Sequence, residues 1–195
     1  MSRKEDYALV LDFLPHGNAG EAKKEPLVQV VGETYFTLLE IVASLGKAFS
    51  PLERVFIGKG ERESVDHIRG RVNYPQLTSS AQRELPAAVA SIVGLREPQF
   101  VDFLNRAGAI SIRAHTLEQL PGVGKKHLEE ILREREKKPF VSFADASARI
   151  SHLGDPKGLF ISRIIEELKG EQKYYLFTKS PAEPHEDYEH RGYRR

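Results

Sequence analysis

The first 75 positions of the chain consist of short apolar runs separated by turn-forming and charged residues. Five runs are rich in Val, Ile, Leu and aromatic residues: 7–14, 27–31, 35–42, 54–57 and 66–74. Runs of this length bounded by such residues predict β-strands, and the fifth run alternates apolar and polar positions as a half-buried strand does. Five short strands joined by turns favour a small OB-like β-barrel over residues 1–75.

From residue 76 onward the spacing of apolar positions becomes helical. Apolar residues recur at intervals of three and four over 79–93 and 97–108, which predicts a helix in each stretch. The same spacing returns further along, so residues 76–170 are expected to form an all-α domain. The predicted fold class is therefore α+β, with an N-terminal β-barrel domain and a C-terminal helical domain.

A Gly-Val-Gly sequence interrupts the helical spacing and predicts a hairpin of two helices over 115–135. Apolar residues repeat at helical spacing on both sides of it: Leu117, Leu120, Leu128, Ile131 and Leu132. Gly122 and Gly124 allow a sharp turn and the close approach of a ligand. Because Lys125 opens the second helix, the unpaired N–H groups there favour an anion. The predicted phosphate-binding residues are Gly122, Val123, Gly124, Lys125 and Lys126.

The sequence at 117–126 resembles the helix-hairpin-helix family of DNA- and RNA-binding modules. The resemblance implies main-chain contacts to phosphate, which carry no information about the base. It therefore implies nucleic-acid binding with little sequence specificity. A glycine-containing turn that merely joins two core helices is the alternative interpretation of the same residues.

A weaker copy of the hairpin pattern follows at 143–168, where the apolar spacing repeats. Its turn carries Asp155 and Lys157 in place of the two glycines, and Pro156 has no N–H to donate. Because a carboxylate repels phosphate, this copy is predicted to be structural and to complete the helical core.

The end of the chain changes character again. Residues 171–179 have the composition of a strand and are expected to return to the barrel as an edge strand. Residues 180–195 combine prolines and many charges with few apolar residues, which predicts a disordered tail.

Charge and composition narrow the classes of function. Lys and Arg total 29 against 28 Asp and Glu, so nucleic-acid binding needs a local basic patch rather than a global field. The chain has no cysteine, which excludes disulfides and thiolate ligands and makes a cytoplasmic location the simplest expectation. The apolar run at 7–14 is too short for a membrane span, so no membrane partner is expected.

A second candidate surface lies in the predicted barrel. A glycine-flanked turn carries Lys59 and Arg62, and Arg69 and Arg71 alternate on one predicted strand. These four cations are predicted to form a basic surface for single-stranded nucleic acid. The alternatives are a tight hairpin turn for the first pair and a solvated strand face for the second.

No arrangement of residues points to catalysis. The histidines show no spacing typical of metal ligands, and serine, histidine and aspartate are too common to define a triad. Base-excision glycosylases place a catalytic aspartate after a similar hairpin, and Asp145 lies near that position. However, Asp145 stands at the entry to the second hairpin pattern. The sequence therefore predicts a non-enzymatic protein without metal or cofactor.

Longer blocks along the chain resemble a family of uncharacterised archaeal proteins described as predicted RNA-binding proteins. The blocks are 7–17, 35–40, 55–62, the hairpin together with 134–140, and 173–177. The resemblance implies an OB-like domain joined to a tandem helix-hairpin-helix domain, and its association with translation favours RNA over DNA. We expect a protein that binds the phosphate backbone, with ribosomal or translation components as partners. The alternative is a protein-interaction adaptor in which the hairpin is only a packing device.

Overall fold

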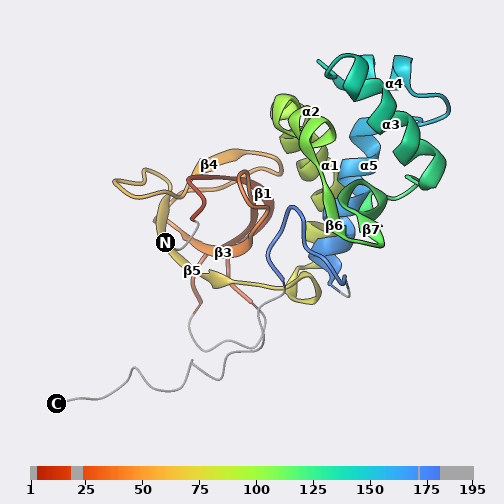
Figure 1. Cartoon of the computed structure of the whole chain (residues 1–195). Helices are drawn as coiled ribbons and strands as arrows, with labels where there is room; N and C mark the ends of the chain where they lie inside the picture. The colour runs from red at the N-terminus through yellow and green to blue at the C-terminus, as the bar shows by residue number, and fades with distance from the viewer. Residues whose placement is uncertain (1–3, 19–23, 171, 181–195) are drawn as a thin grey trace.

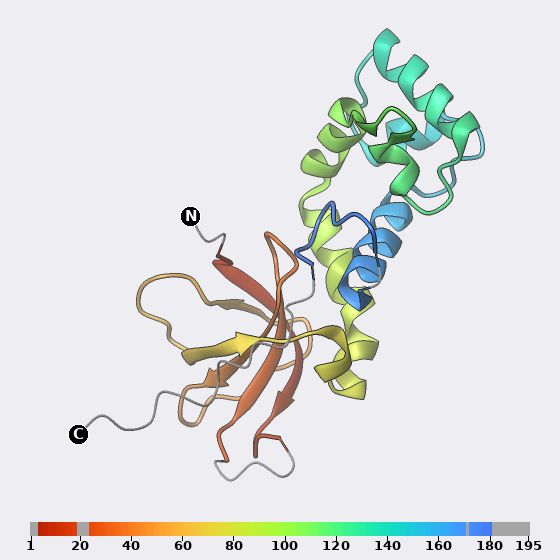
Figure 2. The same cartoon turned by 60° about the horizontal axis from the view of Figure 1, so that its bottom comes forward.

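The computed structural model describes residues 4–18, 24–170 and 172–180. In this part of the chain, a curled antiparallel sheet of five strands is followed by five α-helices (Figure 1). The first helix packs against the sheet, the next three lie farther from it, and the last returns alongside the first (Figure 2). The predicted α+β class is confirmed.

All five predicted strands form, and they pair as one sheet. They are β1 (Tyr7–Leu14), β2 (Leu27–Gly32), β3 (Leu38–Ala43), β4 (Arg54–Phe56) and β5 (Val65–Arg71). The order is β4-β1-β2-β3-β5, with every neighbouring pair antiparallel. The register shifts between Val10 and Asp12 and between Glu40 and Ile41, and such bulges increase the local bend. Since β4 and β5 remain edges in the described part, the sheet is a half-barrel.

A buried carboxylate explains why β3 begins later than the sequence predicts. Glu5 is 6% exposed, and its carboxylate accepts hydrogen bonds from the backbone N–H groups of Thr34 (2.8 Å), Tyr35 (2.9 Å) and Thr37 (3.1 Å). These donors are therefore unavailable to a strand ladder. Gly32 leaves room for the carboxylate, because a Cβ at this position would lie 2.1 Å from Glu5 Cδ.

Alternate residues of β1 face two different hydrophobic clusters, as the pleat of a strand requires. Val10 belongs to a cluster inside the curl of the sheet, whereas Leu9 belongs to a larger cluster outside it. Helix α1 (Ser79–Leu95) packs into this outer cluster through residues such as Leu85. The outer cluster continues into the later helices, so a hydrophobic core crosses the boundary expected after residue 75.

Thr78 fixes the start of α1 on the sheet, directly after the 3-10 helix η1 (Tyr74–Gln76). Its hydroxyl accepts a hydrogen bond from the Ala81 N–H (3.0 Å) and donates one to the Asp12 carboxylate (2.6 Å). Its own N–H donates to Gln29 Oε1 (2.8 Å). The cap and the sheet contact are therefore made by the same residue.

The remaining elements form two successive helical hairpins. They are α2 (Glu97–Arg106), β6 (Ala109–Ser111), β7 (Ala114–His115), the 3-10 helix η2 (Thr116–Gln119), α3 (Lys125–Lys137), α4 (Phe143–Arg149) and α5 (Pro156–Lys169). We call η2, the turn and α3 the first hairpin, and α4, the turn and α5 the second. The sequence did not predict the small β6–β7 ribbon. Helix α5 returns to pack against α1.

The helix expected before the Gly-Val-Gly turn is only a single turn of 3-10 helix. The Leu120 N–H donates to the Leu117 carbonyl (3.1 Å), a bond between residues three apart. Only a few residues separate β7 from Pro121, which has no N–H to continue a helix. The predicted first helix is therefore present only as this short 3-10 turn, because too little chain is available for a longer one.

The described residues 172–180 run back toward the sheet without forming the strand expected at 171–179. Glu167 on α5 is fully buried, and its carboxylate accepts hydrogen bonds from the N–H groups of Leu176 (2.8 Å), Phe177 (3.0 Å) and Thr178 (2.9 Å). A carboxylate thus takes the donors that a strand would offer to its neighbour. Residues 181–195, in the predicted disordered tail, lie outside the described residues.

Candidate nucleic-acid interface

Three buried apolar residues anchor the turn of the first hairpin. Leu117, Leu120 and Val123 are each at most 5% exposed and belong to the outer cluster. The Val123 N–H donates to the Leu120 carbonyl (3.0 Å), so this donor is already used. Gly122 has a φ of +87°, in the left-handed region that favours glycine. Val123 is therefore an anchor of the turn, which corrects its predicted place among the phosphate-binding residues.

The N-terminus of α3 is open to solvent. Gly124 is the N-cap residue, and it supplies no side-chain cap. The backbone N–H groups of Gly124, Lys125 and Lys126 donate to no other residue in the part of the chain that the structure describes. Gly124, Lys125 and Lys126 are exposed, and a Cβ at Gly124 would meet no atom within 4 Å. Such N–H groups, together with the helix dipole, favour an anion.

The side chains of Lys125 and Lys126 add positive charge at this end of α3. Both are exposed, and neither forms a hydrogen bond or an ion pair with another described residue. Farther along the helix, Arg133 and Lys137 lie 3.6 Å and 2.6 Å from the Glu134 carboxylate. These later cations are balanced within the helix, as expected for a charge-laced exposed surface.

The second hairpin has a closed N-terminus at the corresponding place. Asp155 is the N-cap of α5, and its carboxylate accepts the N–H of Lys157 at 3.0 Å. Pro156 occupies the first helical position and has no N–H. The two hairpins therefore differ in the property that matters for anion binding, the availability of main-chain donors.

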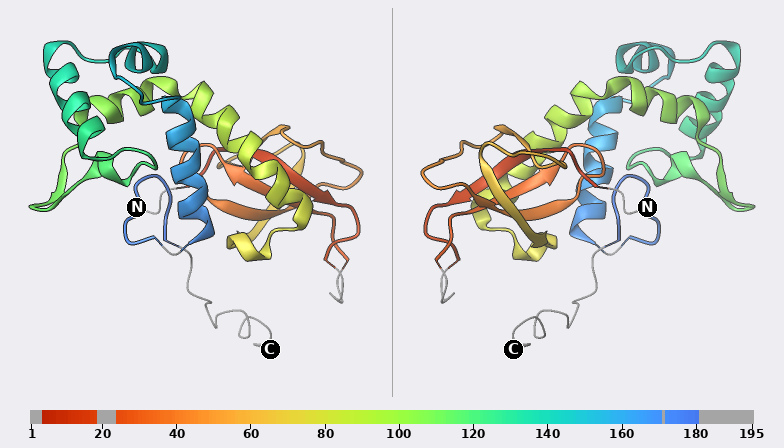
Figure 3. Two further views of the ribbon diagram at one scale, coloured as in Figure 1. Left: turned by 90° about the vertical axis from the view of Figure 1, so that its right-hand side faces the viewer. Right: turned by 90° about the vertical axis from the view of Figure 1, so that its left-hand side faces the viewer.

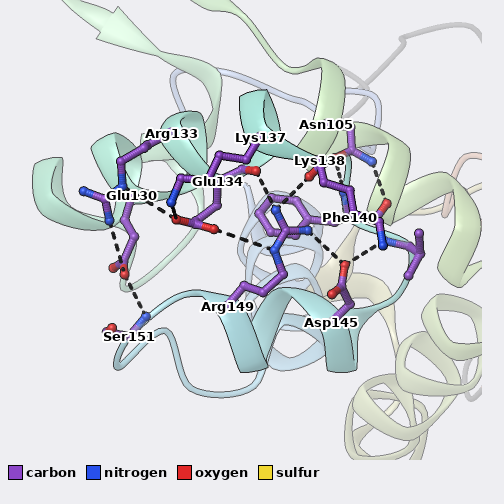
Figure 4. A network of polar contacts seen from close by, with 11 residues as sticks. Asn105, Glu130, Arg133, Glu134, Lys137, Lys138, Phe140, Asp145, Arg149 and Ser151 are labelled. Atoms are coloured by element: carbon purple, nitrogen blue, oxygen red, sulfur yellow. Dashed lines mark hydrogen bonds and ion pairs between the residues drawn. The ribbon is translucent and has the colours of Figure 1, made fainter.

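A polar network holds the other end of α3 against α4 (Figure 4). The Arg149 guanidinium donates to the main-chain carbonyls of Glu134 and Lys138 (2.7 Å to the latter) and to the Asp145 carboxylate (3.2 Å). It also lies over the Phe140 ring, 4.5 Å from the centroid. Because the last carbonyls of a helix lack intrahelical partners, Arg149 completes this end of α3. The network also engages Asp145, the residue at the glycosylase-like position.

A shallow hollow of about 350 Å³ lies beside the open end of α3. The β6–β7 turn lines it with Ile112 and Arg113, and His115 lies at the end of β7. Burial lowers the pKa of His115, the nearby charge of Arg135 lowers it further, and Glu118 opposes both effects. These residues were missed because β6 and β7 are too short to leave a strand pattern in the sequence.

The four cations predicted on the sheet do not form one surface. Lys59 and Arg62 line the same hollow at the edge of the half-barrel. Arg69 instead lies 3.6 Å from the buried Glu40 carboxylate, and Arg71 donates to main-chain carbonyls of the C-terminal segment 179–180. The sheet and α3 also lie at opposite ends of the molecule (Figure 3).

Comparison with known proteins identifies the family. A family described as "Protein of unknown function (DUF655)" matches residues 4–179. The chain belongs to the DUF655 family. A relative, the uncharacterized protein MJ0038 of Methanocaldococcus jannaschii, is 42% identical over 177 residues, which cover 90% of this chain and 80% of the relative. The expected membership of an uncharacterised family with archaeal proteins is confirmed.

A crystal structure supports the fold of this DUF655 protein. The structure of Af1531 from Archaeoglobus fulgidus has a TM-score of 0.83 and 47% sequence identity, and the match covers 90% of this chain and 100% of that one. Within the described residues, no group of three or more His, Cys, Asp or Glu gathers to hold a metal ion. No helix there is long and apolar enough to cross a membrane.

Proposed function

We propose that this DUF655 protein is a non-enzymatic RNA-binding protein that holds the phosphate backbone at the N-terminus of α3. In this proposal the first hairpin is a helix-hairpin-helix module, the second is its degenerate copy, and the half-barrel is OB-like. A cytoplasmic protein with translation or ribosome-assembly partners fits the resemblance on which the preference for RNA rests.

The contrast between the two hairpins supports the proposal most directly. The two hairpins share the apolar spacing, but three successive main-chain N–H groups at the start of α3, those of Gly124, Lys125 and Lys126, have no partner in the described part of the chain. Asp155 closes the corresponding end of α5. A hairpin that served only to pack helices would gain stability from such a cap, worth about 0.5–2 kcal/mol. The open end of α3 is therefore better explained by a ligand than by packing.

The chemistry of this end predicts weak sequence specificity. Main-chain N–H groups and the ammonium groups of Lys125 and Lys126 recognise phosphate oxygens, which are the same in every sequence. Ile112 and Arg113 on the neighbouring ribbon line the hollow beside this end of α3. We infer that the surface follows a few successive phosphates rather than reading bases.

The substitution Gly124→Ala tests the site without disturbing the fold. Gly124 has a φ of −89° and open space around its Cβ position, so alanine is accommodated there. The added methyl group would stand between a phosphate and its N–H donors, and we expect affinity for an RNA hairpin to fall about tenfold. Gly122→Ala is less clean, because its φ of +87° would strain alanine.

Gly108→Ala is the matched control for this test. Gly108 is an exposed glycine with the same open surroundings at its Cβ position, outside the turn of the first hairpin. The Gly108→Ala variant should bind RNA as the wild type does. Equal RNA affinities for Gly124→Ala and Gly108→Ala, measured by fluorescence anisotropy, would contradict the proposal.

The adaptor hypothesis predicts a different kind of surface. A docking protein needs a contiguous apolar patch. The large exposed apolar side chains of the described residues instead come from separate places in the chain: Tyr7, Leu45, Leu52, Ile68, Leu95, Ile112 and Val141. Exposed apolar residues are normal on a protein surface, so these side chains are not by themselves an argument for the adaptor hypothesis.

A further inference from the structure

The half-barrel contains a hollow of about 480 Å³ between its two edge strands. Its walls come from the residues before β1, the start of β3, the segment after β4, and β5. Leu39, Ile57 and Ile68 line it with apolar atoms. Ile68 is 37% exposed, whereas Leu39 (9%) and Ile57 (1%) are buried in the cluster inside the curl. The volume lies within the range of roughly 300–1,000 Å³ typical of small-ligand sites. Ile68 is therefore the apolar side chain that a ligand at this open edge could contact.

Positive charge surrounds this apolar surface. Four cationic residues line the hollow: Lys4, Lys59, Arg62 and Lys179. Two carboxylates accompany them, but that of Glu5 is buried and accepts three backbone N–H groups. Asp6 is therefore the carboxylate left to face a ligand. Lys4 and Lys59 form no hydrogen bond or ion pair within the described residues, so their ammonium groups are available to an anion.

Main-chain contacts hold the wall that carries these groups. The Asp6 carbonyl accepts hydrogen bonds from the N–H groups of Ile57 (2.8 Å) and Gly58 (3.1 Å). Gly58 also leaves room for the Asp6 carboxylate, because a Cβ there would lie 2.6 Å from Asp6 Oδ1. Arg62 Nε donates to the Gly58 carbonyl (2.9 Å), which fixes the guanidinium and leaves its Nη groups without a partner in the described structure.

We propose that this hollow binds one nucleoside monophosphate unit. Its base would cover the apolar surface, its phosphate would lie between Lys59 and Arg62, and the Asp6 carboxylate would accept hydrogen bonds from ribose or base donors. An apolar ligand would leave the cations without a counter-charge, and inorganic phosphate would leave the apolar surface exposed to water. A nucleotide supplies a counter-charge for the cations and a base to cover the apolar surface. It can be a free molecule or one unit of a single strand. The site is remote from α3 and does not depend on the proposed function.

The test is a titration of the protein with uridine and adenosine 5′-monophosphates, followed by the backbone NMR signals of the residues lining the hollow. The matching nucleosides and inorganic phosphate should each bind at least about tenfold more weakly, because each lacks half of the interactions. A single-stranded hexanucleotide that competes with the monophosphate would identify strand units as the source. A hexanucleotide that does not compete would identify the free nucleotide.

Two variants locate the binding. Lys59→Glu should weaken monophosphate binding at least about tenfold, because it replaces an attractive charge by a repulsive one. Arg83→Glu makes the same charge change on the exposed surface of α1, away from the hollow, and should bind as the wild type does. Absence of monophosphate binding, or equal binding by both variants, would overturn the proposal. Gly124→Ala should leave this binding unchanged, so failure of the α3 site and failure of this one are distinguishable.

Discussion

A single buried carboxylate organises the end of the described chain. Glu167 lies beside Arg163, with 2.9 Å between Nε and Oε1, and both side chains are at most 5% exposed. Besides the N–H groups of three residues that follow α5, it accepts the hydroxyl of Thr178. Arg163 in turn donates to Gln172 Oε1 (3.0 Å) and to the Tyr174 carbonyl. The pair is fully hydrogen-bonded, which is the condition under which a buried ion pair is tolerated.

Replacing this carboxylate by an amide should destabilise the protein strongly. Glu167→Gln leaves the Arg163 guanidinium buried without its counter-charge, and we expect the free energy of unfolding to fall by about 3 kcal/mol. The matched control is Glu166→Gln, which removes a half-buried carboxylate with no ion pair to a described residue and should change stability by about 0.5 kcal/mol or less. Urea unfolding of the two variants measures both changes in the free energy of unfolding. Equal midpoints would show that the pair does not hold the segment.

At the scale of the element, the short η2 turn owes its geometry to a histidine. His115 is the N-cap residue, and its Nδ1 accepts the N–H of Leu117 at 3.1 Å. The Glu118 carboxylate closes the turn from the other side by accepting the His115 N–H at 2.8 Å. Since Nδ1 must be unprotonated to accept a hydrogen bond, the neutral imidazole is the form that caps the turn.

This cap makes stability dependent on pH. The pKa of His115 in the folded protein is lowered from its ordinary value of 6.5, chiefly by burial and then by Arg135. Below 6.5 the unfolded chain therefore binds more protons than the folded one, so the free energy of unfolding should fall as pH decreases from about 6.5 through the lowered value. It should be insensitive to His115 above that range. His115→Asn retains a capping acceptor but does not titrate, and its stability should fall less over the same interval.

Urea unfolding between pH 5 and 8 measures the pH dependence of the free energy of unfolding, and NMR titration of the imidazole measures the pKa of His115. An imidazole that titrates at or above 6.5 in the folded protein would contradict this explanation. So would identical pH profiles of stability for the wild type and His115→Asn.

At the scale of the whole molecule, the sequence was informative where structure depends on local patterns. The β1 run at 7–14 forms as predicted because alternation of side chains between two faces is a local property. The strand expected at 171–179 does not form, because N–H groups of this segment donate to the carboxylate of Glu167 on α5. Composition could not reveal a contact made to another element.

In the candidate sites, too, features set by neighbouring residues could be predicted from the sequence, and features set by contacts between distant segments could not. The open N-terminus of α3 followed from Gly124 and the lysines after it, which are neighbours in sequence. By contrast, Arg69 and Arg71 looked equivalent to Lys59 and Arg62, and only the folded chain shows their contacts with Glu40 and the C-terminal segment. The hollow at the edge of the half-barrel is lined by residues from distant parts of the chain, so no single sequence motif predicts it.

The central claim is that phosphate binds at the open end of α3, and a salt titration tests it most directly. Binding to structured RNA, single-stranded RNA and duplex DNA is measured for the wild type and for Lys125→Gln/Lys126→Gln. Each lost phosphate contact should flatten the plot of log affinity against log salt by about 0.7–0.9, so the double variant should lose about 1.4–1.8. Lys137→Gln, at the other end of α3, should retain the wild-type slope. Tightest binding to RNA with this flattening is the predicted result; no binding at low salt, or an unchanged slope, would contradict it.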